Sequence, residues 1–144
     1  MRRPRKVRFN EETAYHCMSR IVGGEFLLGQ EERNYFSNLL HRLGDFLQIK
    51  VITYSVLSNH FHVLPKVPAK GLKIKNSKLL RLLKRFYGKR SPKVLEFRTA
   101  MATPNSPTLE RLRAQYLARM GDLSVFMKEL KERFTKWFNA RHQR

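Results

Sequence analysis

The apolar and polar positions of the chain have strand periodicity in its first half and helical periodicity in its second half. Alternation over 13–22 predicts a strand, and apolar residues at helical spacing over 30–43, with Gly44 as a stop, predict a helix. Segments 46–57 and 60–67 are rich in β-branched and aromatic residues, which predicts two further strands. The expected order is therefore strand, helix, strand, strand.

Short basic helices are predicted after this strand-rich half. One helix, with Asn76 or Ser77 as its cap, is predicted to run to Tyr87, where a glycine follows. Another is predicted from a cap at Ser106 to Met120, because a proline follows the serine at the position that helix starts favour.

Residues 89–107 contain several prolines between these two helices and are predicted to form a loop. The last helix is predicted to begin at an Asp122 cap and to run almost to the chain end. The apolar residues on one face of this helix are Leu123, Phe126, Met127, Leu130, Phe134, Trp137 and Phe138.

Length and composition favour one α+β domain. The chain has 144 residues, 42% of them hydrophobic, which is enough for a single globular core. The expected organisation is a basic arm over 1–12, a sheet-containing core over 13–68, a basic helical insertion over 69–121 and a C-terminal helix over 122–144.

The charge indicates a polyanionic partner. Thirty Lys and Arg against eleven Asp and Glu give a formal charge of +19, which is more than solubility requires. Residues 1–68 carry ten basic and six acidic side chains, a net +4, and residues 69–144 carry twenty and five, a net +15. Nucleic acid is therefore favoured over an anionic membrane surface, with the second half as the contacting part.

The chain lacks a recognisable targeting or membrane segment. No apolar run approaches the roughly 20 residues of a membrane span, and the N-terminus has no signal-peptide hydrophobic segment. We therefore expect a cytoplasmic, nucleoid-associated protein with no membrane partner. The single cysteine, Cys17, excludes an internal disulfide and offers no zinc cluster.

The stretch "LSNHFHVL" at 57–64 contains two histidines separated by one residue. Side chains alternate along a strand, so His60 and His62 share one face. Two imidazoles suit a divalent metal and leave coordination positions open for water, substrate or a third ligand. By spacing alone, histidines that simply pack remain the alternative, because the pattern is weak.

Three segments of the chain resemble one known family. They are "YHCMSR" at 15–20, "LSNHFHV" at 57–63 and "MKELKERFTKWFNARH" at 127–142. In the same order, they are similar to the first strand, the metal-binding strand and a basic helix of the REP-associated tyrosine transposases, within the HUH single-strand endonuclease superfamily. The resemblance covers roughly residues 13–68 and 122–142, with a long insert between them.

The resemblance implies a ferredoxin-like HUH palm, that is, a βαββ core with an antiparallel sheet. It also implies that His60 and His62 hold Mg²⁺ or Mn²⁺, which polarises a phosphate of single-stranded DNA. A tyrosine then attacks the phosphodiester, leaving a 5′-phosphotyrosyl intermediate and a free 3′-hydroxyl. This is the cleavage and joining step of DNA transposition.

The nucleophilic tyrosine is where the chain departs from the family. The family tyrosine lies on a later helix, in a pattern such as "R-Y-I-E-x-N-P", whereas this sequence ends at "ARHQR". We therefore expect a chain truncated before the tyrosine helix and inactive in cleavage. Three internal tyrosines are predicted core residues, namely Tyr15, Tyr35 and Tyr54, and the remaining weak candidates for the nucleophile are Tyr87 and Tyr116.

Other residues are candidate contacts to nucleic acid. Arg20 at a strand end either contacts a phosphate or is a solvated edge residue, and Asn59 either orients a ligand or forms the turn. No partner is identified for His16 and His41, and both are assigned structural roles. The basic candidates in and after the predicted helix ending at Tyr87 are Lys78, Arg81, Lys84, Arg85, Lys89 and Arg90.

Two functions from different classes remain open. The first is a transposase-like domain that acts on single-stranded or hairpin DNA, and the second is a non-catalytic module that binds a DNA or RNA hairpin. An RRM-type RNA-binding sheet shares the element order, but "HFHVL" stands where that fold carries stacking aromatics. A second copy of this chain, as a homodimer, is a further candidate partner.

Overall fold

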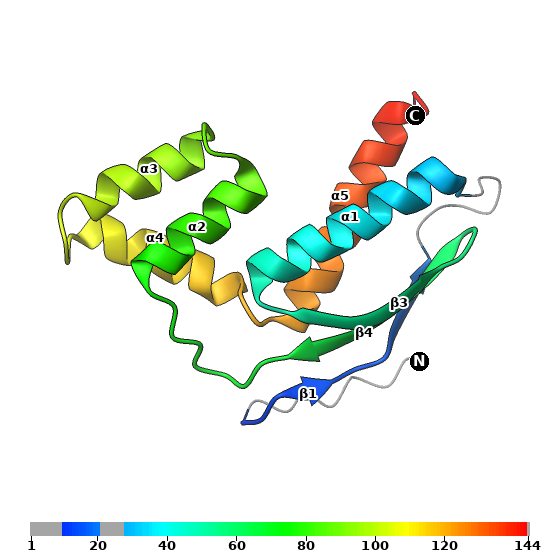
Figure 1. The fold of residues 1–144 in the computed structure, drawn as a ribbon, viewed down its shortest axis with the longest axis horizontal. Helices are drawn as coiled ribbons and strands as arrows, with labels where there is room; N and C mark the ends of the chain where they lie inside the picture. The colour runs from blue at the N-terminus through cyan, green and yellow to red at the C-terminus, as the bar shows by residue number, and fades with distance from the viewer. Residues whose placement is uncertain (1–9, 21–27, 144) are drawn as a thin grey trace.

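The computed structural model describes residues 10–20 and 28–143. Within these residues the chain forms an α+β fold, as predicted, with an antiparallel sheet (Figure 1). The elements in chain order are β1 (Thr13–Ala14), β2 (Cys17–Arg20), α1 (Gln30–Leu47), β3 (Lys50–Val56), β4 (His60–Val67), α2 (Asn76–Tyr87), α3 (Pro92–Met101), α4 (Pro107–Arg119) and α5 (Leu123–Arg141).

Strand β4 is the centre of the sheet. It pairs antiparallel with β1 and β2 on one side and with β3 on the other. Its side chains alternate strictly, with Phe61 and Val63 buried and His60 and His62 half-buried. Helices α1 and α5 lie on the same side of the sheet in Figure 1, which explains why one set of positions on β4 is apolar.

The main core lies between the sheet, α1 and α5. Phe36 of α1 is fully buried and contacts Phe61 of β4 and Phe134 of α5, with ring centroids 4.8 and 5.4 Å away. One side chain therefore links the sheet to both helices that cover it, through large apolar surfaces that dominate core energetics.

Helices α2, α3 and α4 form a second group of helices beside one end of the sheet (Figure 1). Phe86 of α2 stacks on Phe46 of α1, with ring centroids 4.8 Å apart. Arg119 at the end of α4 donates to both carboxylate oxygens of Glu129 in α5, at 2.7 and 2.9 Å. The ion pair is half-buried and bidentate, and in this geometry pairs of arginine and carboxylate are strong.

An open cavity of about 590 Å³ lies where this helical group joins the rest of the fold. Its lining comes from two stretches, 67–72 after β4 and 114–124 around the turn into α5, together with Tyr15. A Cβ added to Gly121 would lie 3.3 Å from atoms of Leu72 and Pro68, so the two stretches are in close contact.

Gly44 does not end α1, contrary to the prediction. The helix continues to Leu47, and β3 begins only at Lys50, so the predicted strand over 46–57 was wrong at its start. Phe46 and Leu47 are fully buried on the helix, and burying them there outweighs their strand-like local pattern. Gln48 at φ 59° ends the helix instead.

Gly44 allows a close backbone approach rather than a helix stop. A Cβ at this position would lie 2.8 Å from the carbonyl oxygen of Ile49, inside van der Waals contact. We expect Gly44→Ala to lower the free energy of unfolding by about 1–2 kcal/mol, because overpacking outweighs the better helix propensity of alanine. Chemical denaturation would measure this, with the exposed Asn38→Ala of the same helix as control. An unchanged midpoint for Gly44→Ala would contradict the steric account.

The predicted loop over 89–107 was also wrong, because residues 92–101 form α3. Ser91 caps this helix by accepting from the Lys93 amide at 3.3 Å, and Pro92 occupies its first turn, where proline is favoured. Val94 and Phe97 are buried at helical spacing. The proline that was interpreted as a break is therefore part of a helix start.

Three smaller details differ from or agree with the predictions. The predicted first strand is interrupted at 15–16, giving β1 and β2, and residues 21–22 of the prediction lie outside the described residues. The N-cap of α2 is Lys75, and Asn76 instead accepts from Arg113 at 2.6 Å. Ser106 and Asp122 cap α4 and α5 as predicted.

Among the described helices, none is long and apolar enough to cross a membrane.

Candidate metal and nucleic-acid site

His60 and His62 lie on the sheet face opposite α1 and α5, as the alternation predicts. Both are half-buried, and their ring centroids are 5.3 Å apart with the rings at 71° to each other. The hairpin that leads into them closes with the Leu57 amide donating to the His60 carbonyl at 2.9 Å. The two imidazoles are therefore close neighbours at the start of the central strand.

Asn59 fixes the orientation of the first histidine. Its Oδ1 lies 2.8 Å from Nδ1 of His60. An amide oxygen only accepts hydrogen bonds, so Nδ1 of His60 carries the proton and Nε2 has the free lone pair. Asn59 therefore lies in the turn, as the structural alternative predicted, and its side chain also orients the ring of His60.

His16 is the functional candidate that the sequence did not identify. Its Nε2 lies 3.1 Å from Nδ1 of His62, and the two rings are nearly parallel, with centroids 5.2 Å apart. Alternation along the predicted strand over 13–22 puts His16 on the same face as Met18 and Arg20, and this was the available signal. That this face meets the histidine pair follows only from the register between β2 and β4, in which Met18 pairs with His62.

The surroundings of the histidines combine a cation with exposed apolar groups. Arg20 is exposed, and its Cα is paired with that of His60 across β2 and β4. Met18 and Leu57 are 49% and 41% exposed. Within the described part of the chain, no three His, Cys, Asp or Glu side chains converge on a point that could hold a metal ion.

The basic candidates surround the exposed side of α2. Lys78 and Arg81 are exposed, and Lys84 is half-buried. Arg85 pairs with Asp45 at 3.3 Å, so part of its charge is neutralised within the chain. Lys89 and Arg90 are exposed in the turn after the helix.

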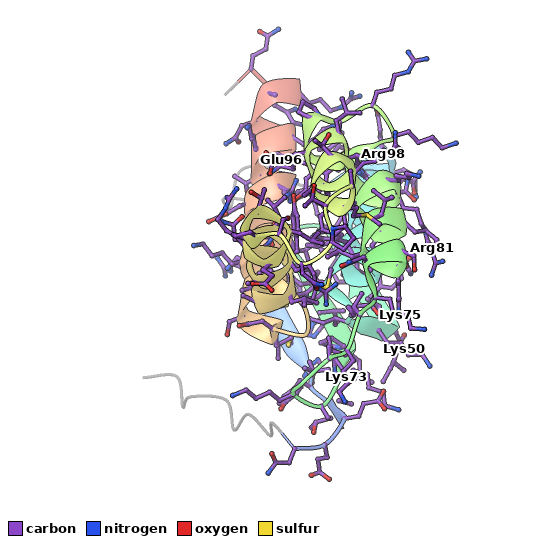
Figure 2. The ribbon with its side chains drawn as sticks, turned by 90° about the vertical axis from the view of Figure 1, so that its left-hand side faces the viewer. Lys50, Lys73, Lys75, Arg81, Glu96 and Arg98 are labelled. Atoms are coloured by element: carbon purple, nitrogen blue, oxygen red, sulfur yellow. The ribbon has the colours of Figure 1, made fainter. Side chains whose placement is uncertain are left out.

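A row of cations continues this surface beyond α2. Figure 2 shows Arg81, Lys75 and Lys50 of β3 along one side of the molecule, with Arg98 of α3 above them and Lys73 below. We call this row, together with Lys78, the basic edge. Residues 46–95 contain no Asp or Glu, so the chain itself supplies no carboxylate from this stretch to neutralise the row. Glu96, the first acid after it, lies on the other side of α3 in Figure 2.

The basic edge and the histidines are joined by β4. His62 and Lys66 are four positions apart, which is about 13 Å along a strand. Lys66 is paired with Lys50 of the basic edge across β3 and β4, and it forms an ion pair with Glu12 at 3.4 Å. A nucleic-acid strand of a few nucleotides would reach from one site to the other.

All five tyrosines of the chain lie in described residues. The prediction of Tyr54 as a core residue was wrong, because its side chain is 37% exposed on β3, where its hydroxyl accepts from Ser37 of α1 at 2.7 Å.

The hydroxyl of Tyr87 accepts from Arg119 at 3.3 Å. Tyr116 is buried against the rings of Phe46 in α1 and Phe97 in α3, and burial raises the pKa of its hydroxyl. The two weak candidates for a nucleophile thus belong to helices α2 and α4, away from the strands that carry the histidines.

Tyr15 and Tyr35 are half-buried against the core, as the sequence predicted. Tyr35 stacks on Trp137 of α5 with ring centroids 3.9 Å apart, so Trp137 packs against α1.

No protein-family model, curated protein or solved structure matches this chain.

Proposed function

We propose that this chain binds single-stranded or hairpin DNA and presents its histidine face to a phosphate of the bound strand, in the manner of an HUH transposase domain. The observation that carries the proposal is the position of His60 and His62, adjacent on the face of the central strand opposite α1 and α5. The order β2, β4, β3 with helices on one face is also that of a ferredoxin-like βαββ unit, which supports the proposed palm.

The charge distribution supports a polyanionic ligand. The basic edge presents lysine and arginine heads from β3, α2, α3 and the segment before α2, next to a stretch of fifty residues without an acid. Phosphate contacts of this kind supply sequence-independent affinity that falls as salt rises. Such a partner fits a cytoplasmic, nucleoid-associated protein.

The histidines would contribute through a divalent ion, Mg²⁺ or Mn²⁺, with imidazole favouring Mn²⁺. The ion would bind and orient a phosphate oxygen through its open positions. We expect Mn²⁺ to tighten binding of a labelled hairpin-ended single strand, as measured by fluorescence anisotropy. The double variant His60→Ala, His62→Ala should lose this increment and keep the affinity measured without metal. An equal Mn²⁺ increment in parent and variant would remove the metal role from the pair.

A second candidate function is a hairpin-binding module without cleavage activity. The placement of Tyr87 and Tyr116 favours it, because one hydroxyl is engaged by Arg119 and the other is buried. A nucleophile must be held in line with the scissile phosphate, and loss of that proximity removes roughly 7–11 kcal/mol of assistance.

We therefore expect the 144-residue chain to form no covalent adduct with DNA. The measurement is a denaturing gel of the chain incubated with labelled hairpin DNA and Mn²⁺. A labelled band at the mass of a protein–DNA adduct would contradict this prediction. If Tyr87→Phe or Tyr116→Phe abolished that band, the missing hydroxyl would be identified as the nucleophile.

A further inference from the structure

We propose that His16 is a metal ligand and shares one divalent cation with His62. The cation site would then extend from β4 onto the residue before β2, rather than being confined to the pair on β4. This inference rests on the proposed function, since it adds a ligand to the same sheet face.

The spacing of the two nitrogen atoms carries the inference. Nitrogen ligands bind a divalent ion at about 2.0–2.1 Å, so two of them at tetrahedral or octahedral angles are about 2.8–3.4 Å apart. Nε2 of His16 and Nδ1 of His62 lie 3.1 Å apart. These two atoms therefore already have the separation that a shared ion requires, and modest ring rotations would aim both lone pairs at it.

The backbone holds His16 in this position. The amide of Tyr15 donates to the carbonyl of Pro65 at 3.0 Å, and Cys17 pairs with Val63, so both neighbours of His16 are bound to β4. The side chain of His16 itself is exposed. A ligand held by its flanking residues loses little freedom on binding an ion, which favours affinity.

The protons of the pair are compatible with ion binding. In the 3.1 Å contact one of the two facing nitrogens carries a hydrogen and the other accepts it. A cation would replace that hydrogen, which would move through solvent to the other nitrogen of the same ring. Both imidazoles would stay neutral, the form in which histidine binds metals.

His60 is placed to complete the site. Asn59 holds its Nδ1 and leaves Nε2 for a ligand bond, and its ring is 5.3 Å from that of His62. Within the described ranges, no three His, Cys, Asp or Glu side chains already converge on one point. His60 would therefore join the cation site after a side-chain rotation. Three imidazoles without a carboxylate favour Mn²⁺, Co²⁺ or Zn²⁺ over Mg²⁺, which prefers oxygen ligands.

Calorimetric titration of the full chain with Co²⁺, without DNA, tests the proposal. His16→Ala and His62→Ala should each weaken Co²⁺ binding by about tenfold or more, since loss of a ligand costs at least as much as loss of its hydrogen-bond partner. The matched control is His41→Ala, because His41 is an exposed histidine on α1 that bonds the Ser37 carbonyl. The control should bind Co²⁺ like the parent.

Two outcomes would overturn the inference. One is parental Co²⁺ affinity in a folded His16→Ala variant, with His16→Phe as the second variant if the alanine form unfolds. The other is a parent chain that does not bind Co²⁺ at all. Neither outcome bears on DNA binding through the basic edge, which is measured without metal, so the two proposals fail separately.

Discussion

Replacing Lys75, Lys78 and Arg81 by glutamate is expected to weaken binding of single-stranded DNA by about a hundredfold or more at low salt. These side chains are exposed and come from a stretch without acids, so each is available to a phosphate. Three lost contacts should also reduce the slope of log affinity against log salt by about 2, at roughly 0.7 per phosphate for a single strand. Anisotropy titrations at several salt concentrations measure both quantities.

A charge-matched variant separates a defined surface from net charge. Lys128, Lys131 and Lys136 are exposed on α5, which packs on α1 and lies apart from the basic edge. Their triple replacement by glutamate changes the net charge by the same amount. We expect a much smaller loss of affinity for this control. Equal losses in the two variants would show that the basic edge is not the binding surface.

Phe36→Ala is expected to cost about 3–5 kcal/mol of folding free energy, which is a large part of the total for a domain of ordinary stability. The ring is fully buried and contacts both Phe61 and Phe134, so its removal leaves a cavity between the sheet and two helices. Urea denaturation followed by circular dichroism measures the loss.

The control for this prediction is Leu95→Ala in α3. Leu95 is 49% exposed, so its truncation should change stability by no more than about 0.5 kcal/mol. A Phe36→Ala variant with a midpoint close to the parent would mean that the sheet and α1 are not packed as described.

Periodicity was sufficient for elements whose burial repeats regularly. Strand β4 and helix α5 follow the predicted alternation and helical face, because each buries one continuous set of side chains. The prediction failed where long-range packing decided the local structure. Phe46 and Leu47 look like strand residues by composition, but the core they enter is reached from the end of α1.

The candidate site was predictable only within one strand. The spacing of His60 and His62 is a local property, so their shared face followed from alternation. The contact of His16 with His62 spans 46 residues and depends on the register between β2 and β4, which no local pattern specifies.

Of the basic edge, the sequence candidates included only Lys78 and Arg81. Lys50 and Arg98 join it through tertiary structure, whereas Lys73 and Lys75 directly precede α2 and were not among the candidates.

The cavity near Gly121 has a consequence for how such a chain can vary. Its two lining stretches are the exit from the sheet layer after β4 and the return into α5, and they touch through Pro68, Leu72 and Gly121. A segment whose ends are adjacent can be exchanged for a longer or shorter one with little disturbance to its host. Exchange of helices α2 to α4 would therefore leave the two ends of the host close together, but it would also remove the stacking of Phe86 on Phe46 and the ion pair of Arg119 with Glu129, which a replacement segment would have to restore.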